Sequence, residues 1–407
     1  MTRWTRREWL ALTTMQAAAS IAALATRQDS REERIRGIIQ AYERQGFHRT
    51  ATDVDRLSGE WLCGEVEQAG LMPSREAFSI ERVDPMEAAV VVQGRRIDGV
   101  PLFDAAFTDA AGVTGRIGAI DGDAPIGLVQ IAPNAAGAGP LGAARHANRH
   151  RAIVCITRGG RPGLCPSNAD AFDQPFGPPV VQVSSEEAAF LDECAKQGSD
   201  VQVRAHVKRT PSQAFNVVAE LAGATRTLPP LIVMTPRSGW WRCASERGGG
   251  IACWLELMRE VGATKPARDV LFVASSGHEL GHLGINAFID RRPSIVSRTV
   301  GWMHFGANIG AAQDPGNTLQ ASDDGFEAMQ AEAMQSAELR IDRRVARGTV
   351  PGGEAEAVHR GGGRYVSVIG RNALFHNPAD RGPDAVDVSA VARFVDAFAT
   401  VAKKLAA

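Results

Sequence analysis

The chain has 407 residues, of which 44% are hydrophobic and 22% are charged, and its formal net charge is -1. These values are typical of a globular protein and exclude the charge bias of a nucleic-acid or membrane-surface binder. The length exceeds one ordinary hydrophobic core, so we expect two domains after a leader, with no later segment apolar enough to span a bilayer.

The amino terminus has the pattern of a twin-arginine export signal. Arg6 and Arg7 precede a mildly apolar, alanine-rich run, and Ala23-Leu24-Ala25 supplies small residues for cleavage. We predict a signal peptide over residues 1–25 and a periplasmic or secreted protein. The alternative is an ordinary amphipathic first helix.

Six cysteines would be free to form disulfides in an oxidising compartment. Six can pair in fifteen ways and the spacing selects none of them, so buried thiols are the default expectation. They are Cys63, Cys155, Cys165, Cys194, Cys243 and Cys253.

The periodicity of the remaining chain changes twice. Helical spacing over residues 30–44 and 51–69 gives way to short β-like runs between glycines and prolines from about Val83 to Thr210. From Phe215 onward, strands and helices alternate, which predicts a mostly parallel sheet covered on both faces. Helices are expected at 249–261, 279–290, 326–339 and 388–405, and strands at 270–274, 300–303 and 365–369.

The stretch DVLFVASSGHELGHLG, residues 269–284, joins an apolar strand directly to a His-Glu pair. In open α/β sheets, ligands bind at the carboxyl ends of the strands, where His278 and Glu279 are expected. The same letters contain HELGH, in which His278 and His282, four residues apart, would bind zinc on a helix with Glu279 as the base. The two interpretations predict different sites.

Beyond this pattern, the chain resembles the co-catalytic zinc aminopeptidases, a family that includes secreted aminopeptidases and glutaminyl cyclases. The likeness rests on GFHRTATDVDRLSGEWLCGEVEQAGL, NVVAEL, FVASSGHELGHLG and FHNPAD, in that order. The β-rich stretch resembles the protease-associated domain inserted in exported peptidases. The resemblance implies an α/β fold with a mostly parallel central sheet, divided into an N-terminal helical part (26–84), an insert (85–210) and a peptidase-like domain (211–407).

At several metal-ligand positions the sequence departs from the family. The first ligand pair falls on Pro236-Arg237-Ser238, and proline binds no metal. The resemblance puts the bridging carboxylate at Glu246 and the catalytic base at His278. One zinc ion held by Glu246, Glu279 and His376 has a precedent in the glutaminyl cyclases, with His304 at a further ligand position.

Other residues are candidates for contacting substrate. Arg237, Trp240, Trp241 and Arg242 follow the first core strand, where they could hold a carboxylate or stack on an aromatic group. Arg237 could also replace the charge of a lost metal ion, and Glu354 or Glu356 could supply a carboxylate.

Together these features predict an exported, aminopeptidase-like metallohydrolase with a non-standard, single-zinc site. Its substrate would be an amide bond of a peptide or small amidated compound. The alternative is a peptidase-like protein that has lost metal-dependent proteolysis and binds a ligand, or runs a cyclase-like or other non-proteolytic reaction, in the same cleft.

Overall fold

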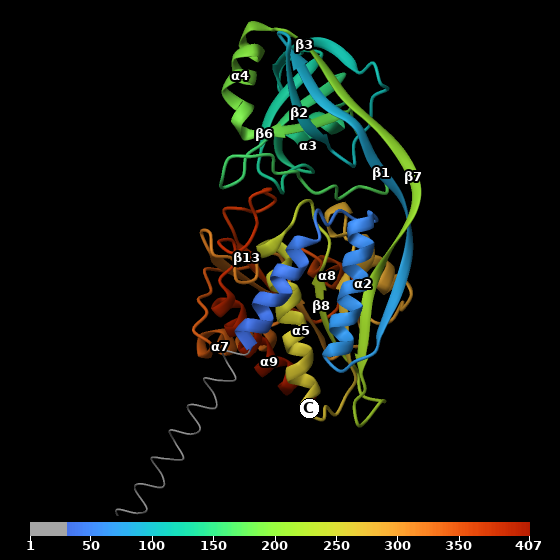
Figure 1. Ribbon diagram of the computed structural model, residues 1–407, viewed down its shortest axis with the longest axis vertical. Helices are drawn as coiled ribbons and strands as arrows, with labels where there is room; N and C mark the ends of the chain where they lie inside the picture. Colours follow the sequence, from blue (N-terminus) through green and yellow to red (C-terminus); the bar gives the residue numbers. More distant parts are fainter. Residues whose placement is uncertain (1–30) are drawn as a thin grey trace, which may run out of the picture.

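The computed structural model describes residues 31–407, so the predicted signal peptide lies outside the described residues. The chain forms two parts, a lower α/β part and an upper β-rich part, joined by two long strands (Figure 1). Within residues 31–407, no helix is long and apolar enough to cross a membrane.

The lower part is built on a mixed sheet whose four central strands, β9, β8, β10 and β13, are mutually parallel. Antiparallel strands flank this centre, β7 beside β9 and β11 beside β13. The α/β class predicted from the sequence is confirmed. The strands are β8 (Leu231–Pro236), β9 (Val270–Ser275), β10 (Gly301–Phe305), β11 (Gly316–Ala321), β12 (Arg343–Arg344) and β13 (Tyr365–Arg371).

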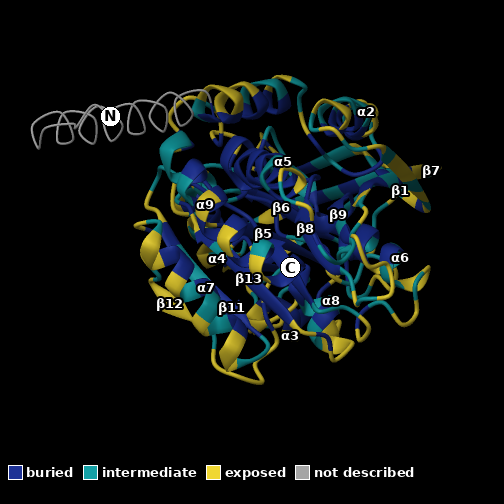
Figure 2. Ribbon diagram, turned by 90° about the horizontal axis from the view of Figure 1, so that it is seen from below, coloured by how far each residue is buried: buried dark blue, intermediate teal, exposed yellow. Residues whose placement is uncertain are grey.

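Helices cover both faces of this sheet. On one face, the helix over residues 31–44 packs with α2, α5, α7 and α9 in a single apolar cluster, and on the other face α6 and α8 pack in a second. The central strands and the inward sides of the helices are buried (Figure 2). The helices are α2 (Asp53–Gln68), α5 (Gly249–Gly262), α6 (Leu283–Asp290), α7 (Asp324–Ser336), α8 (Ala355–Arg360) and α9 (Val388–Ala406).

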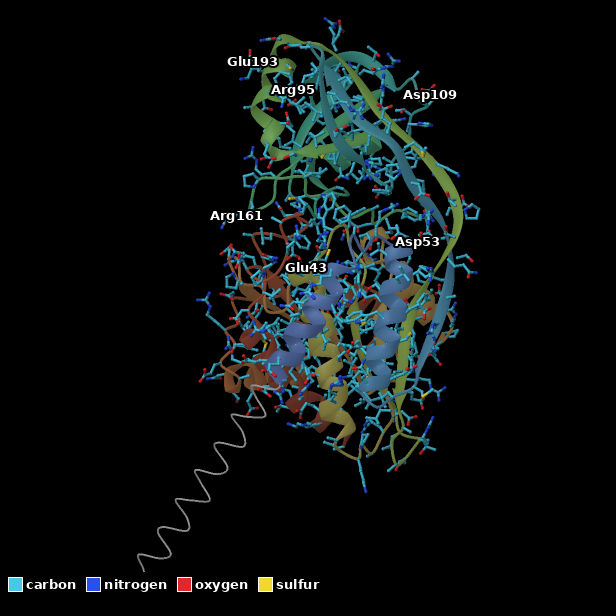
Figure 3. All side chains as sticks on the ribbon, in the orientation of Figure 1. Glu43, Asp53, Arg95, Asp109, Arg161 and Glu193 are labelled. Atoms are coloured by element: carbon cyan, nitrogen blue, oxygen red, sulfur yellow. The ribbon has the colours of Figure 1, made fainter. Side chains whose placement is uncertain are left out.

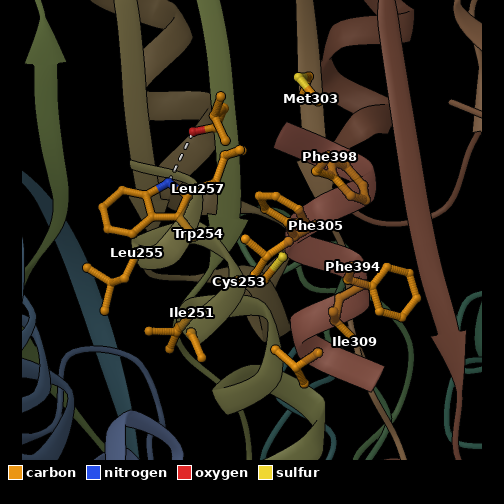
Figure 4. Close-up of a cluster of buried hydrophobic side chains, with 14 of the residues drawn as sticks. Ile251, Cys253, Trp254, Leu255, Leu257, Met303, Phe305, Ile309, Phe394 and Phe398 are labelled. Carbon is orange, nitrogen blue, oxygen red and sulfur yellow. Dashed lines mark hydrogen bonds between the residues drawn. The ribbon is translucent and has the colours of Figure 1, made fainter. Parts of the chain in front are cut away.

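Helix α5 anchors the larger cluster and fixes the position of the turn before it. Trp254 is fully buried and its indole N–H donates to the Val233 carbonyl at 3.2 Å, while Phe305 from β10 lies 4.2 Å from Phe398 of α9 between ring centroids (Figure 4). Burial of aromatic rings of this size contributes strongly to core stability.

The upper part is a closed arrangement of β-strands. Its order runs β1-β2-β6-β5-β4-β3-β7, and β1 pairs again with β7 from Pro73 opposite Ala219 to Val92 opposite Val201. Both long strands therefore belong to both parts. The elements are β1 (Pro73–Val92), β2 (Arg95–Pro101), β3 (Val113–Ala119), β4 (Ile126–Ile131), α3 (Gly139–Ala147), β5 (Ala152–Thr157), β6 (Val180–Ser184), α4 (Ala188–Gln197) and β7 (Asp200–Leu221).

One predicted helix begins later than expected. His278–Leu280 form a single 3-10 turn, and Gly281 and His282 have positive φ angles of 80° and 61°. Helix α6 therefore starts at Leu283, not at Glu279, and HELGH does not lie within one helix. The i, i+4 helical geometry of the alternative zinc motif is not formed.

Candidate functional site

The carboxyl ends of the parallel strands meet at the boundary between the two parts. Ser238 follows β8, His278 and Glu279 follow β9, His304 lies near the end of β10, and His376 follows β13. This is the edge at which open α/β sheets bind ligands. The sequence-predicted residues Glu246, His278, Glu279, His304 and His376 are all buried here.

Glu246 reaches this edge on a π-helical turn, Ala244–Gly248, that leads into α5. The Asp380 carboxylate accepts the backbone N–H groups of Ser245 and Glu246, each at 2.9 Å, and so fixes the turn. Close packing demands glycine next, because a Cβ on Gly249 would lie 1.9 Å from the Ile309 carbonyl oxygen.

Glu246 is paired with a neighbouring cation. The Arg247 Nη2 lies 2.8 Å from Glu246 Oε1, and both side chains are buried. Arg247 Nε also donates to the Ser238 carbonyl at 2.7 Å. Burial alone would raise the pKa of Glu246, but Arg247 and His376 lower it to about 2, so the carboxylate is charged at neutral pH.

His376 completes this group from the other side. Its Nε2 lies 3.4 Å from Glu246 Oε1, and its Nδ1 lies 2.6 Å from the Pro166 carbonyl in the upper part. The carbonyl accepts a hydrogen bond from the Nδ1–H group, which leaves Nε2 as the nitrogen with a free lone pair in that tautomer.

Glu279 is surrounded by hydrogen-bond donors. Its Oε1 accepts from the Thr50 N–H at 2.7 Å and from the Thr50 hydroxyl at 2.6 Å, and its Oε2 accepts from the Ser238 hydroxyl at 2.6 Å. Burial raises the pKa of this carboxyl, against the opposing effect of the Ser238 and Thr50 donors. Both carboxylate oxygens of Glu279 therefore already accept hydrogen bonds from protein groups.

His278 forms a pair with a second buried carboxylate. Its Nδ1 lies 3.6 Å from Glu354 Oε1, which accepts the Ser275 hydroxyl at 2.5 Å. The His282 ring centroid lies 4.8 Å from that of His278. Burial, and then the charge of Arg247, lower the pKa of His278 well below its usual range, so its ring is neutral.

His304 lies deeper in the same region. Its Nδ1 is 2.8 Å from the Ser367 hydroxyl on the neighbouring strand β13. Burial lowers its pKa to about 4, with Arg247 and His282 acting in the same direction.

A cleft of about 690 Å³ opens at this boundary, and of the five predicted residues only His278 lines it. Its walls come from both parts of the molecule, with Asn168 and Asp170 above and His278, His282 and Asn372 below. Side chains from both parts approach one another at this level, where Arg161 and Asp53 are labelled (Figure 3). Charged groups of both signs line the cleft, namely Asp170, Asp342, Glu356, Arg343 and Arg371.

The predicted substrate-side tryptophans line a different, apolar pocket of about 460 Å³ with Phe47 and Phe103. Trp240 packs 5.1 Å from Phe103 between ring centroids, and the Trp241 indole donates to the His376 carbonyl at 2.8 Å. Trp241, in the wall of this pocket, therefore contacts the loop whose residues Asn372 and Phe375 line the cleft.

The two predicted arginines are held elsewhere. Arg237 is fully buried, 2.8 Å from Asp55 Oδ1, and donates to the Phe215 carbonyl at 2.6 Å. Arg242 donates to the Glu43 carbonyl at 3.3 Å. In the described part of the chain, the residues lining the cleft and the apolar pocket include neither arginine.

Sequence reasoning missed Arg247 and Thr50. Arg247 directly follows Glu246 in CASERGGG, so a charged residue beside a predicted ligand was a visible signal. Thr50 is 229 residues from Glu279 in the chain, and nothing local indicates that contact.

The predicted ligand set does not fit a zinc ion in this arrangement. Among residues 31–407, no group of three or more His, Cys, Asp or Glu side chains is placed to hold a metal. Glu246 is paired with the Arg247 cation, and both Glu279 oxygens accept hydrogen bonds from Thr50 and Ser238. A zinc site needs three or four free donors around one point.

No protein-family model matches this sequence, and a search of curated proteins finds no match. Solved structures do match. A zinc aminopeptidase from Bacillus subtilis superposes with a TM-score of 0.74 at 15% identity, covering 93% of this chain and 94% of that one. An aminopeptidase from an Aneurinibacillus species gives 0.69 at 15% identity, with 92% and 94% covered.

A peptidase precursor from Shewanella amazonensis also matches, with a TM-score of 0.69 at 14% identity over 93% of this chain and 97% of that one. The chain therefore has the fold of these aminopeptidases over nearly its whole described length. At this identity the likeness defines the fold, and the site must be argued from its own residues.

Proposed function

We propose that this protein binds a peptide or a small amidated compound in the cleft between its two parts, and that it has lost metal-dependent proteolysis. The observation that carries the proposal is the cleft of about 690 Å³ with His278 and His282 in its wall. This volume suits a small molecule or a short peptide.

The charge pattern of the cleft supports this class of ligand. Asp170 and Glu356 provide acidic groups, while Arg343 and Arg371 provide guanidinium groups. A peptide carries an ammonium and a carboxylate group at opposite ends, and each sign has a partner here. The adjoining apolar pocket, with Trp240 and Trp241 in its wall, would accept an apolar side chain.

Calorimetric titration with dipeptides and amidated amino acids tests the proposal. Arg371→Gln should weaken binding about tenfold to a hundredfold, since a charge-assisted hydrogen bond contributes about 1.5–3 kcal/mol. Arg364→Gln is the matched control, because Arg364 is also exposed and ion-paired but lies at another pocket. If the wild-type protein binds no ligand of this class, the proposal fails.

Amide hydrolysis is the second candidate, favoured by the His278–Glu354 pair. In this reaction the His278 imidazole would take a proton from water and the Glu354 carboxylate would stabilise the imidazolium, against the burial and the Arg247 charge that lower the pKa of His278. Glu354→Gln should then lower kcat toward amino acid anilides and leave KM nearly unchanged. Turnover that survives a chelator would support this mechanism.

The metal-dependent form of hydrolysis predicts the opposite response to the chelator. In that form, Glu246, Glu279 and His376 would hold one zinc ion, with His304 nearby and His278 as the base. Turnover would then stop on chelation and return with zinc. The hydrogen bonds at Glu279 and the ion pair at Glu246 weigh against it.

Export also belongs to the proposal. The twin arginines Arg6 and Arg7 and the alanine-rich run support cleavage near residue 25 and a periplasmic or secreted mature protein. Amino-terminal sequencing of the protein from the periplasmic fraction should begin near residue 26. An intact amino terminus found in the cytoplasm would contradict export. The boundaries 26–84, 85–210 and 211–407 stay proposed.

A further inference from the structure

Six buried polar atoms lie in the cluster around Arg247 without a hydrogen-bond partner among the described residues, although two of them, Glu246 Oε1 and Arg247 Nη2, form an ion pair 2.8 Å long. The six are Glu246 Oε1, Arg247 Nη2, His278 Nδ1, His304 Nε2, Glu354 Oε2 and His376 Nε2. Buried polar atoms are nearly always partnered in native proteins, so this cluster needs an explanation.

The group at the centre of this cluster is a fixed cation. The Arg247 side chain is fully buried, and its only carboxylate ion pair within residues 31–407 is with Glu246, at 2.8 Å. Burial lowers the pKa values of His278, His282 and His304, and the positive charge of Arg247 lowers each of them further. One guanidinium therefore acts on three imidazole rings and one carboxylate.

The spacing of Glu246 and His376 matches that of two ligands on one metal ion. Their donor atoms, Oε1 and Nε2, are 3.4 Å apart. Ligands about 2.0–2.1 Å from a tetrahedral zinc ion are separated by about 3.3–3.4 Å. A zinc ion between them would lie against Arg247, and the two positive charges would repel.

We propose that Arg247 is a built-in cation that fills a latent metal site. Its guanidinium neutralises Glu246 and keeps the carboxylate and His376 at ligand spacing, and its presence prevents a divalent cation from binding. Removal of this charge lets Zn²⁺ or Co²⁺ bind to Glu246 and His376. The inference does not depend on which ligand the cleft takes.

Arg247→Met tests this, because methionine is uncharged and fills much of the same space. Arg237→Met is the matched control, since Arg237 is also fully buried and also lies 2.8 Å from a single carboxylate, Asp55. Binding of Co²⁺, followed by its visible absorption, and zinc content by elemental analysis report the metal directly and need no activity.

We expect Arg247→Met to bind Co²⁺ at least about tenfold more tightly than the wild type or Arg237→Met does. His376→Ala added to Arg247→Met should abolish the gain. Equal cobalt affinity in Arg247→Met and Arg237→Met would overturn the proposal, as would one tightly held zinc ion in the wild-type protein.

If Arg247→Met does not fold in the absence of metal, refolding with Co²⁺ gives the answer. Recovery of the native circular dichroism spectrum with Co²⁺, and not with Mg²⁺, supports the latent site. Failure to refold with either ion counts against it. Peptide titration of the wild type tests the proposed function, whereas cobalt binding to Arg247→Met tests the latent metal site. Failure of one proposal can therefore be distinguished from failure of the other.

Discussion

At the scale of single residues, the buried charges of this site are balanced by protein groups. Glu246 is paired with Arg247, and Glu279 accepts from Thr50 and Ser238. A buried carboxylate without such partners would be costly, because charge transfer out of water is unfavourable. Removal of any one of these partner groups should therefore destabilise the folded protein.

Ser238 is a sharp test because its hydroxyl makes three contacts. It donates to Glu279 Oε2 at 2.6 Å and accepts the N–H groups of Gly277 and His278. Ser238→Ala should lower the free energy of unfolding by about 1–3 kcal/mol, since a buried carboxylate oxygen loses its donor. Urea denaturation measures this.

The control for Ser238 is Ser74→Ala, at an exposed strand position where the hydroxyl donates to the Val218 carbonyl at 3.1 Å. Ser74→Ala should lower the free energy of unfolding clearly less than Ser238→Ala does. Equal losses from the two substitutions would mean that Ser238 does not support the Glu279 carboxylate.

His48 predicts a specific loss of stability in acid. Its ring is fully buried, stacked 3.7 Å from Tyr42 between centroids, and burial lowers its pKa to about 3. An unfolded histidine has a pKa of about 6.5, so between about pH 6.5 and pH 3 the unfolded chain binds a proton that the native state does not. Stability contributed by neutral His48 is therefore present above this window and lost as the pH falls through it.

Thermal melting at pH 7 and pH 5 tests the His48 prediction. The drop in Tm between these pH values should be smaller in His48→Phe than in the wild type, even if the variant is less stable at pH 7. An unchanged drop would show that His48 titrates in the native protein as it does in the unfolded chain.

At the scale of elements, the start of α5 is limited by close packing. Gly249→Ala would put a Cβ 1.9 Å from the Ile309 carbonyl oxygen, so backbone must move. We expect a loss of about 1–3 kcal/mol or more in the free energy of unfolding. The displacement would also shift the turn that carries Glu246.

Gly262, at the other end of the same helix, is the matched control. A Cβ there would meet no heavy atom of the described residues within 4 Å. Gly262→Ala should be neutral or stabilise by about 0.4–1 kcal/mol, because it restricts the unfolded chain. If Gly249→Ala is as well tolerated as Gly262→Ala, the packing account of this helix start is wrong.

Element positions were well predicted where the periodicity was strong, and poorly where glycine changed the local geometry. The strand at Val270 and the helix ending at Asp290 lie where the sequence predicts them. The start of that helix was missed because Gly281 and His282 adopt left-handed conformations that interrupt it. The spacing of apolar residues indicates a helix, but it does not indicate that residues within it adopt left-handed conformations and delay its start.

At the scale of the whole molecule, β1 and β7 connect the two parts into one continuous sheet. An apolar cluster that includes Phe103, Trp240 and Leu280 lies at the junction. The two parts were predicted from the change in residue periodicity along the chain. The sequence could not predict that Glu279 would be hydrogen-bonded to Thr50, because that contact depends on how distant elements pack.

Phe103→Ala should loosen this junction. Phe103 is 3% exposed, and truncation of a buried phenylalanine costs about 3–5 kcal/mol. Hydrogen exchange should accelerate in the cleft-lining segment 166–172 and stay slow in α5. Phe190→Ala, on α4 away from the junction, is the control and should leave segment 166–172 unchanged. Equal exchange in that segment in both variants would contradict the role of the junction.

The most direct measurement of the central claim is a crystal structure of the wild-type protein grown with zinc, with anomalous data collected at the zinc absorption edge. The account predicts ordered Arg247 density against Glu246 and no anomalous peak between Glu246 and His376. A strong peak at that position, with the Arg247 side chain turned away, would contradict it and restore a metal-dependent site.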